Sequence, residues 1–261
     1  MENNALRRII KMLELAYTEE TVFPPTDLYN EGWMLRILLS LQSEGIDCLP
    51  FAFRPGTRWF SEALIASPFL TRFRGDPLAE GYTHLDGVVG HFEFRPETKA
   101  GLTLSADATQ LVLLEAKMFS PLSRGITNAT YYDQAARTMA CMAWTIGQLG
   151  RSVDEFESLG FYVIAPQEQI ARGVFDPQVE ESSIKAKVGR RVSAYKEEDN
   201  YRELQAWYDT VFFPVMELTD INCISWEDAI DRVDHASVRE FYERCRTFSA
   251  SVSLQASSNL V

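Results

Sequence analysis

The chain has 261 residues, a length that suits one large domain. Its net charge of −12 argues against a general nucleic-acid coat protein, because phosphate affinity comes from lysine and arginine, but it leaves room for a local basic cleft. Four cysteines that are far apart and lack pair spacing favour a reducing compartment and no zinc site, and three histidines argue against a histidine-based metal centre. Without a membrane-length apolar run or a signal pattern, we expect a cytoplasmic protein that does not enter a membrane.

Two helices are predicted in the N-terminal part. Apolar residues recur at helical spacing over residues 1–20, and prolines then end the pattern. Thr26 or Asp27 is expected to cap a second helix that ends at Gly45. On that helix Glu31 shares a stripe with Leu35. Glu31 is therefore either directed into the protein or solvated at the rim of the stripe.

Residues 46–80 mix arginines with aromatic side chains, including Arg72 and Arg74 on either side of Phe73. A short strand, a turn and a helix over residues 61–66 are expected here. Arginines bind phosphates and aromatic rings stack on bases, so Arg72 and Arg74 are candidate substrate contacts. The alternative is an ordinary loop with its rings in the core and its arginines in solvent.

Two strands are expected to bring acidic residues together. Residues 111–119 are apolar on both sides of a period-2 alternation, as in a strand buried on both faces. Glu115 and Lys117 follow on one face of it, where a carboxylate and an ammonium are costly to desolvate. Asp86 opens a strand over residues 87–94. If the strands pair, Asp86 and Glu115 meet at one sheet edge and can hold Mg²⁺ or Mn²⁺.

The constellation Asp86…Glu115-x-Lys117 resembles the PD-(D/E)XK nuclease superfamily over roughly the first two thirds of the chain, by the order of elements. Leu85, rather than proline, precedes Asp86. Lys117 would orient or activate a water, and the Ala116 carbonyl is a further candidate metal ligand. The resemblance implies that Glu31 reaches the metal or its water. The alternative for Glu115 and Lys117 is a structural ion pair.

The downstream half carries the remaining candidates. A helix capped by Thr127 or Asn128 and ending at Gly150 contains Gln134, which the resemblance places beside the metal; a solvent-facing glutamine is the alternative. A strand over residues 161–165 should run parallel to the Lys117 strand. A basic helix over residues 180–198 offers a phosphate-facing wall or merely a solvated face. Its candidate substrate contacts are Lys185, Arg190 and Arg191.

We therefore predict a three-layer α/β/α fold with a central mixed sheet, a restriction-endonuclease-like core and extra C-terminal helices. Residues 1–248 would form one domain and residues 249–261 a disordered tail. We predict that the protein is a Mg²⁺- or Mn²⁺-dependent nuclease that acts on nucleic acid, with DNA as the favoured substrate. The alternative is an inactive nuclease-like module that binds nucleic acid or protein. The oligomeric state stays open, with a homodimer one option.

Overall fold

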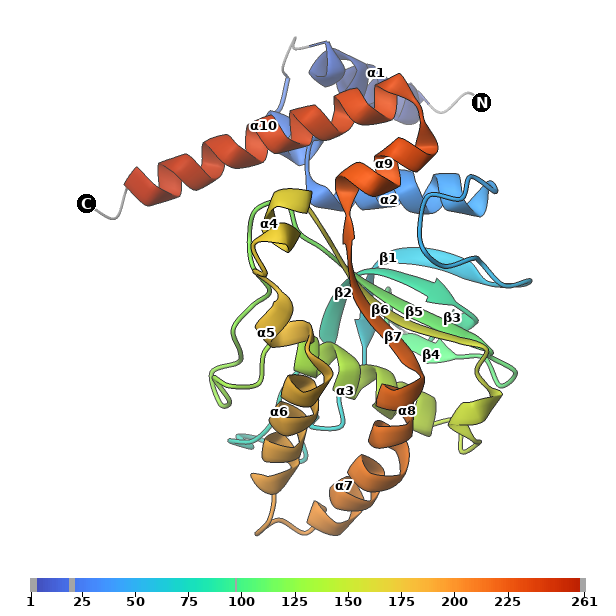
Figure 1. The fold of residues 1–261 in the computed structure, drawn as a ribbon, viewed down its shortest axis with the longest axis vertical. Helices are drawn as coiled ribbons and strands as arrows, with labels where there is room; N and C mark the ends of the chain where they lie inside the picture. The colour runs from blue at the N-terminus through green and yellow to red at the C-terminus, as the bar shows by residue number, and fades with distance from the viewer. Residues whose placement is uncertain (1–3, 19–21, 97, 259–261) are drawn as a thin grey trace.

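A mixed five-stranded sheet forms the centre of the computed structural model, which describes residues 4–18, 22–96 and 98–258 (Figure 1). Its strand order is β1-β2-β5-β6-β7, in which β1, β2 and β5 are antiparallel neighbours and β5, β6 and β7 are parallel. A separate ribbon pairs β3 with β4. The strands are β1 (Arg58–Ile65), β2 (Thr83–Gly90), β3 (Phe92–Phe94), β4 (Leu102–Leu104), β5 (Gln110–Ala116), β6 (Ser158–Ala165) and β7 (Thr219–Ser225).

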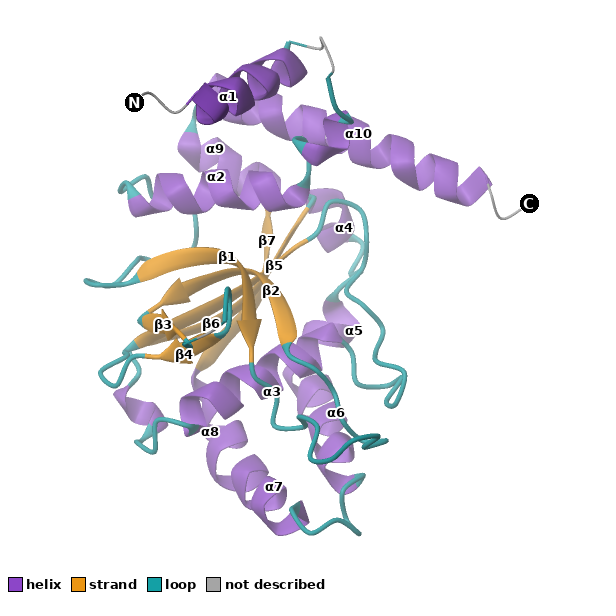
Figure 2. Cartoon of the chain, turned by 180° about the vertical axis from the view of Figure 1, so that it is seen from behind, coloured by secondary structure: helices purple, strands orange, loops and turns teal. Residues whose placement is uncertain are grey.

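Helices cover both faces of this sheet (Figures 1 and 2). One face is covered by α3 (Gln134–Gly147), α6 (Glu181–Ser193), α7 (Tyr201–Trp207) and α8 (Phe213–Leu218), with a π-helical turn at Tyr208–Phe212 between the last two. The other face is covered by α2 (Glu31–Ser43) and α9 (Trp226–Val233), and α1 (Asn4–Tyr17) and α10 (Ala236–Ser258) lie outside these two helices. The short helices are α4 (Gln167–Ala171) and α5 (Asp176–Val179), with 3-10 turns at Pro25–Asp27 and Val153–Glu155.

The alternation along β5 divides its side chains between two cores. Leu111 and Leu113 join the core under α3, whereas Val112 and Leu114 join the core under α2. Every residue of β5 is buried, as the prediction of a doubly covered strand requires. The predicted parallel pairing of β5 with β6 is also confirmed. Glu115 thus lies on the α3 side, because residues two apart share a face.

Several local predictions were wrong. Residues 61–65 belong to strand β1 instead of a helix. Asn30 caps α2, because its side chain accepts a hydrogen bond from the Trp33 N–H at 3.0 Å. Asp133 caps α3 in the same way, so this helix starts later than predicted. The last helix continues to Ser258 instead of ending at residue 248, and its final turns contain no glycine or proline that would stop it.

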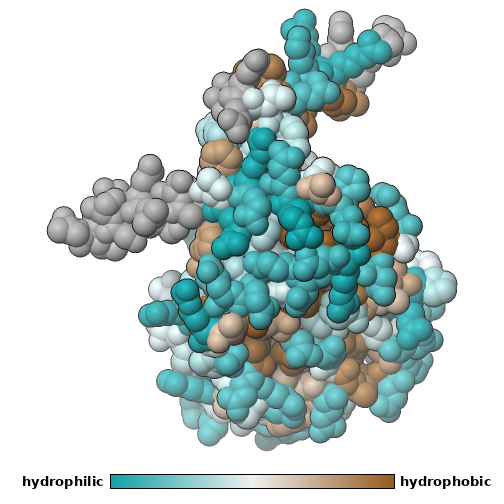
Figure 3. All heavy atoms as spheres, turned by 45° about the horizontal axis from the view of Figure 1, so that its top comes forward, coloured by the Kyte–Doolittle hydropathy of each residue, from teal (hydrophilic) through white to brown (hydrophobic). Residues whose placement is uncertain are grey.

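The surface seen in Figure 3 is mostly hydrophilic, with hydrophobic patches that polar side chains interrupt. Large apolar side chains are exposed on α1, where Leu6, Ile9 and Ile10 are each about half exposed. Within the described part of the chain, none of the helices has both the length and the apolar character needed to span a bilayer.

Candidate active site

β2 and β5 separate at the position of their acidic residues. The antiparallel ladder pairs Gly87 with Leu114, which places Asp86 and Glu115 at the next opposing positions. Beyond this point β2 stays paired with β1, whereas β5 follows β6. The Ala116 N–H donates to Oδ2 of Asp86 at 2.8 Å. A carboxylate thereby takes the place of a strand partner and is held at the opening between the two strands.

The ammonium of Lys117 lies between the two carboxylates. Its Nζ is 3.4 Å from Oδ2 of Asp86 and 3.4 Å from Oε2 of Glu115. The Lys117 N–H donates to the carbonyl of Ile164 in β6 at 2.8 Å, which fixes the backbone from which the side chain projects. The side chain of Glu115 is fully buried, whereas that of Asp86 is 30% exposed. The cluster therefore reaches solvent on its Asp86 side.

The α3 helix supplies two further partners to Glu115. Gln134 donates from Nε2 to Oε2 of Glu115 at 2.5 Å, while its Oε1 accepts from the Ser123 N–H at 3.0 Å. One turn later, Thr138 donates from Oγ1 to Oε1 of Glu115 at 3.4 Å. Gln134 thus lies beside the acidic pair, and the alternative, a solvent-facing side chain, is wrong. The contact of Thr138 was missed, although its spacing of four from Gln134 placed it on a neighbouring stripe.

Burial and like charge shift the ionisation of the pair. Burial, and after it the neighbouring charge of Asp86, raise the pKa of Glu115 to about 8 against the opposing effect of Lys117. Burial alone would lower the pKa of Lys117, but the two carboxylates outweigh it and leave that pKa raised. One ammonium thus faces two acids. The cluster favours additional positive charge, either a proton or a cation.

The oxygen atoms of this cluster suit a hard divalent cation. The described residues contain no group of three or more His, Cys, Asp or Glu side chains able to hold a metal ion. An ion here would therefore depend on Asp86 and Glu115, with the predicted main-chain oxygen of Ala116 and water completing its shell. Mg²⁺ is commonly held by only one or two carboxylates. The residues present fit such an ion, because two carboxylates face one ammonium and leave a negative charge that attracts a cation.

Glu31 is the first residue of α2. The helix does pack beside the cluster, since a Cβ added at Gly87 would lie 3.0 Å from Cδ2 of Leu35. Among the hydrogen bonds and ion pairs of the described residues, however, none joins Glu31 to Asp86, Glu115 or Lys117. Its role at a metal stays a prediction.

Two of the arginines that were predicted to contact substrate instead contact other residues of the protein. Arg72 forms ion pairs with Asp76 at 2.8 Å and Glu198 at 2.9 Å, which tie the 72–76 loop to the segment after α6. Arg191 is fully buried, and its guanidinium lies 5.1 Å from the centroid of the Phe69 ring. A surface phosphate cannot reach Arg191, so the prediction that it binds substrate is wrong.

The other predicted cations lie at the surface. Arg74 and Arg190 are exposed, and the guanidinium of Arg190 lies 3.7 Å above the ring of Tyr131. Lys185 pairs with Glu181 one helical turn earlier. The Lys185 side chain is 23% exposed and that of Glu181 54%, and an ion pair that water reaches contributes little. These three side chains stay available to an anionic partner.

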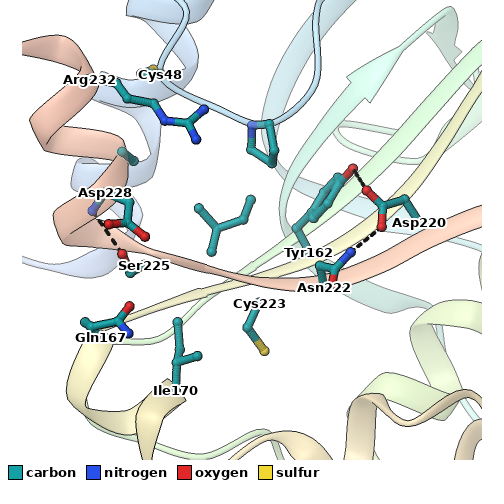
Figure 4. A pocket seen from close by; sticks show the side chains of 13 residues that line it. Cys48, Tyr162, Gln167, Ile170, Asp220, Asn222, Cys223, Ser225, Asp228 and Arg232 are labelled. Atoms are coloured by element: carbon teal, nitrogen blue, oxygen red, sulfur yellow. Dashed lines mark hydrogen bonds between the residues drawn. The ribbon is translucent and has the colours of Figure 1, made fainter.

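A small cavity of about 270 Å³ lies between β7, α4 and α9 (Figure 4). Figure 4 shows Arg232 and Asp228 directed into it from α9, with Asp220 on the opposite wall. Tyr162 donates a hydrogen bond to Asp220 at 2.7 Å. With two carboxylates and one guanidinium on its walls, this cavity repels phosphate on balance.

No protein-family model matches the chain, and no match to a curated protein or to a solved structure is found.

Proposed function

We propose that the protein is a metal-dependent nuclease with a restriction-endonuclease-like core, which hydrolyses phosphodiester bonds in nucleic acid, with DNA as the favoured substrate. One observation carries the proposal. The Lys117 ammonium lies 3.4 Å from a carboxylate on each of two strands, at the point where these strands separate. Burying charges at this depth opposes folding, and such arrangements are concentrated at functional sites.

Each residue of the cluster has a distinct task in this proposal. Asp86 and Glu115 hold Mg²⁺ or Mn²⁺, which when bound polarises the phosphate and stabilises the leaving oxygen. Lys117 orients the attacking water and offsets negative charge as it develops on the phosphate. Asp86 is the more exposed of the two acids, so substrate approaches from its side.

Gln134 and Thr138 act through Glu115. Together they occupy both oxygens of its carboxylate, at 2.5 Å on Oε2 and 3.4 Å on Oε1. Side chains that orient a metal ligand in this way preorganise the first coordination shell. They are positioning residues in this proposal, since neither is proposed to touch the substrate.

A cleavage assay tests the proposal. Wild type incubated with Mn²⁺ or Mg²⁺ should cut DNA or RNA, and EDTA should prevent it. Lys117→Ala should lower the rate by at least ~100-fold. Lys196→Ala is the matched control, because Lys196 is an exposed lysine just beyond α6. Equal rates for wild type and Lys117→Ala would contradict the mechanism.

Measurements of DNA binding and Mn²⁺ binding separate the proposed enzyme from the alternative, an inactive nuclease-like module. A wild-type protein that binds labelled DNA, shows no heat with Mn²⁺ in calorimetry and never cleaves would be a nuclease-like binding module. Metal binding that Asp86→Asn abolishes, together with cleavage, would support the enzyme.

A further inference from the structure

A large cavity of about 840 Å³ adjoins the candidate active site. It opens between the loop that follows β5, the α4–α5 segment and α6. Its walls include Phe119, Arg124, Asp133, Gln169 and Lys187. The volume falls within the range of about 300–1,000 Å³ that accommodates drug-sized ligands.

The cavity and the acidic cluster share one wall. Leu122 and Arg124 line the cavity, and the N–H of Ser123 between them donates to Oε1 of Gln134 at 3.0 Å. Asp133, which immediately precedes Gln134, also lines the cavity. Phe119 is only two residues beyond Lys117. The cavity and the cluster are thus connected through the loop after β5 and the start of α3.

Gln169 gives this wall an unused hydrogen-bond acceptor. The residue is only 8% exposed, and its Nε2 donates to the carbonyl of Phe119 at 2.6 Å. Its Oε1 is buried and accepts no hydrogen bond within the described part of the chain. Buried polar atoms are normally paired, so the wall lacks a donor that a ligand N–H could supply.

Arg124 gives the same cavity a free cation. It is exposed and takes part in no hydrogen bond or ion pair among residues 4–18, 22–96 and 98–258. Lys187 is partly neutralised, because its Nζ lies 2.6 Å from Oδ2 of Asp133. With the charges of Lys187 and Asp133 offsetting each other, Arg124 gives the lining a positive balance, in contrast to the acid-lined cavity in Figure 4.

We propose that this cavity binds one nucleotide of the substrate next to the cleaved phosphate. A base N–H donates to Oε1 of Gln169, the face of the base packs against Phe119, and the phosphate pairs with Arg124. Stacking on an aromatic ring combined with a basic contact to the backbone is how proteins hold single-stranded nucleic acid. The inference rests on the proposed nuclease function and adds a subsite to it.

Two variants test the subsite, Arg124→Ala and Gln169→Leu, with Arg172→Ala as the control. Arg172 is an exposed arginine at the end of α4, so its loss removes the same charge outside the cavity. Melting curves confirm that each variant is folded. Fluorescence anisotropy with a short labelled single-stranded DNA in EDTA gives Kd, and cleavage of the same DNA in Mn²⁺ gives kcat and KM.

Both cavity variants should raise Kd and KM by about 5- to 10-fold, the loss typical of one hydrogen bond or charged contact, while kcat changes less than about 2-fold. If wild type cleaves and both variants behave like Arg172→Ala, the subsite is wrong and the nuclease stands. If wild type never cleaves, the nuclease is wrong. Anisotropy then decides the subsite by itself: weaker binding by both variants supports it, and unchanged binding overturns it.

Discussion

Nε2 of Gln134 donates a hydrogen bond of 2.5 Å to Oε2 of Glu115, which joins the first residue of α3 to the end of β5. The same oxygen lies 3.4 Å from the Lys117 ammonium. Because Ser123 donates to the other end of the Gln134 amide, its orientation is fixed. The helix therefore sets the position of a carboxylate on the sheet.

Replacing Gln134 by leucine should weaken this control without removing a metal ligand. We expect the Mn²⁺ concentration for half-maximal cleavage to rise, or the rate to fall, by about 10- to 100-fold. Gln148→Leu is the control, at the exposed opposite end of the same helix. A titration with Mn²⁺ measures the effect, and coincident curves for the two variants would show that Gln134 does not position Glu115.

The raised pKa of Glu115 makes the stability of the protein depend on pH. The unfolded carboxyl ionises near 4.5, whereas the folded one ionises at about 8. The folded state holds the extra proton between these values, so this contribution to stability is complete below about pH 4.5 and is lost as pH rises towards 8. Glu115→Gln cannot ionise and should not show the loss.

Urea unfolding over this range measures the difference. The free energy of unfolding of wild type minus that of Glu115→Gln should fall steadily from about pH 5 to pH 8. A difference independent of pH would mean that Glu115 is ionised throughout.

Metal binding should be coupled to the same proton. A cation held by Asp86 and Glu115 needs both carboxylates ionised, so binding of Mn²⁺ should release a proton and strengthen as pH rises towards 8. The increase in melting temperature caused by Mn²⁺ should grow over that range and vanish in Asp86→Asn. Asp107→Asn, at an exposed turn, should keep the full increase. Stabilisation that Asp86→Asn retains would place the ion elsewhere.

Two adjacent arginines of α6 should differ sharply in their effect on stability. Arg191 is fully buried between aromatic rings and donates to the carbonyl of Leu78, whereas Arg190 is exposed. Losing the packing and the hydrogen bond of a buried side chain costs about 1–3 kcal/mol, whereas surface changes usually cost within about 0.5 kcal/mol. Arg191→Met should therefore lower the free energy of unfolding far more than Arg190→Met, as urea denaturation would measure. Similar losses would contradict the burial of Arg191.

The sequence was sufficient to predict the strand that carries Glu115, whereas the strand predicted over residues 87–94 was wrong in its bounds, because β2 spans Thr83–Gly90 and Phe92–Phe94 belong to a separate ribbon. An apolar run with period-2 alternation fixes which residues of β5 share a face, and this places Glu115 and Lys117 on the same side. The helix between β5 and β6 leads to a parallel pair. These features are local or follow from chain connectivity, so no knowledge of distant contacts was needed.

Other features depended on residues distant in the chain. The sequence did not show that Asn30 and Asp133 cap their helices. Several polar residues near each helix start could act as the cap, and the preceding loop decides which one does. The basic run of α6 could not show that Arg191 points inward, since its cage comes from Phe69, Tyr132 and Tyr195 in three separate segments. The short distances among Asp86, Glu115 and Lys117 likewise could not be predicted, because they depend on where β2 separates from β5. Alternation determines the face on which a side chain lies, whereas strand pairing and packing decide what that side chain meets.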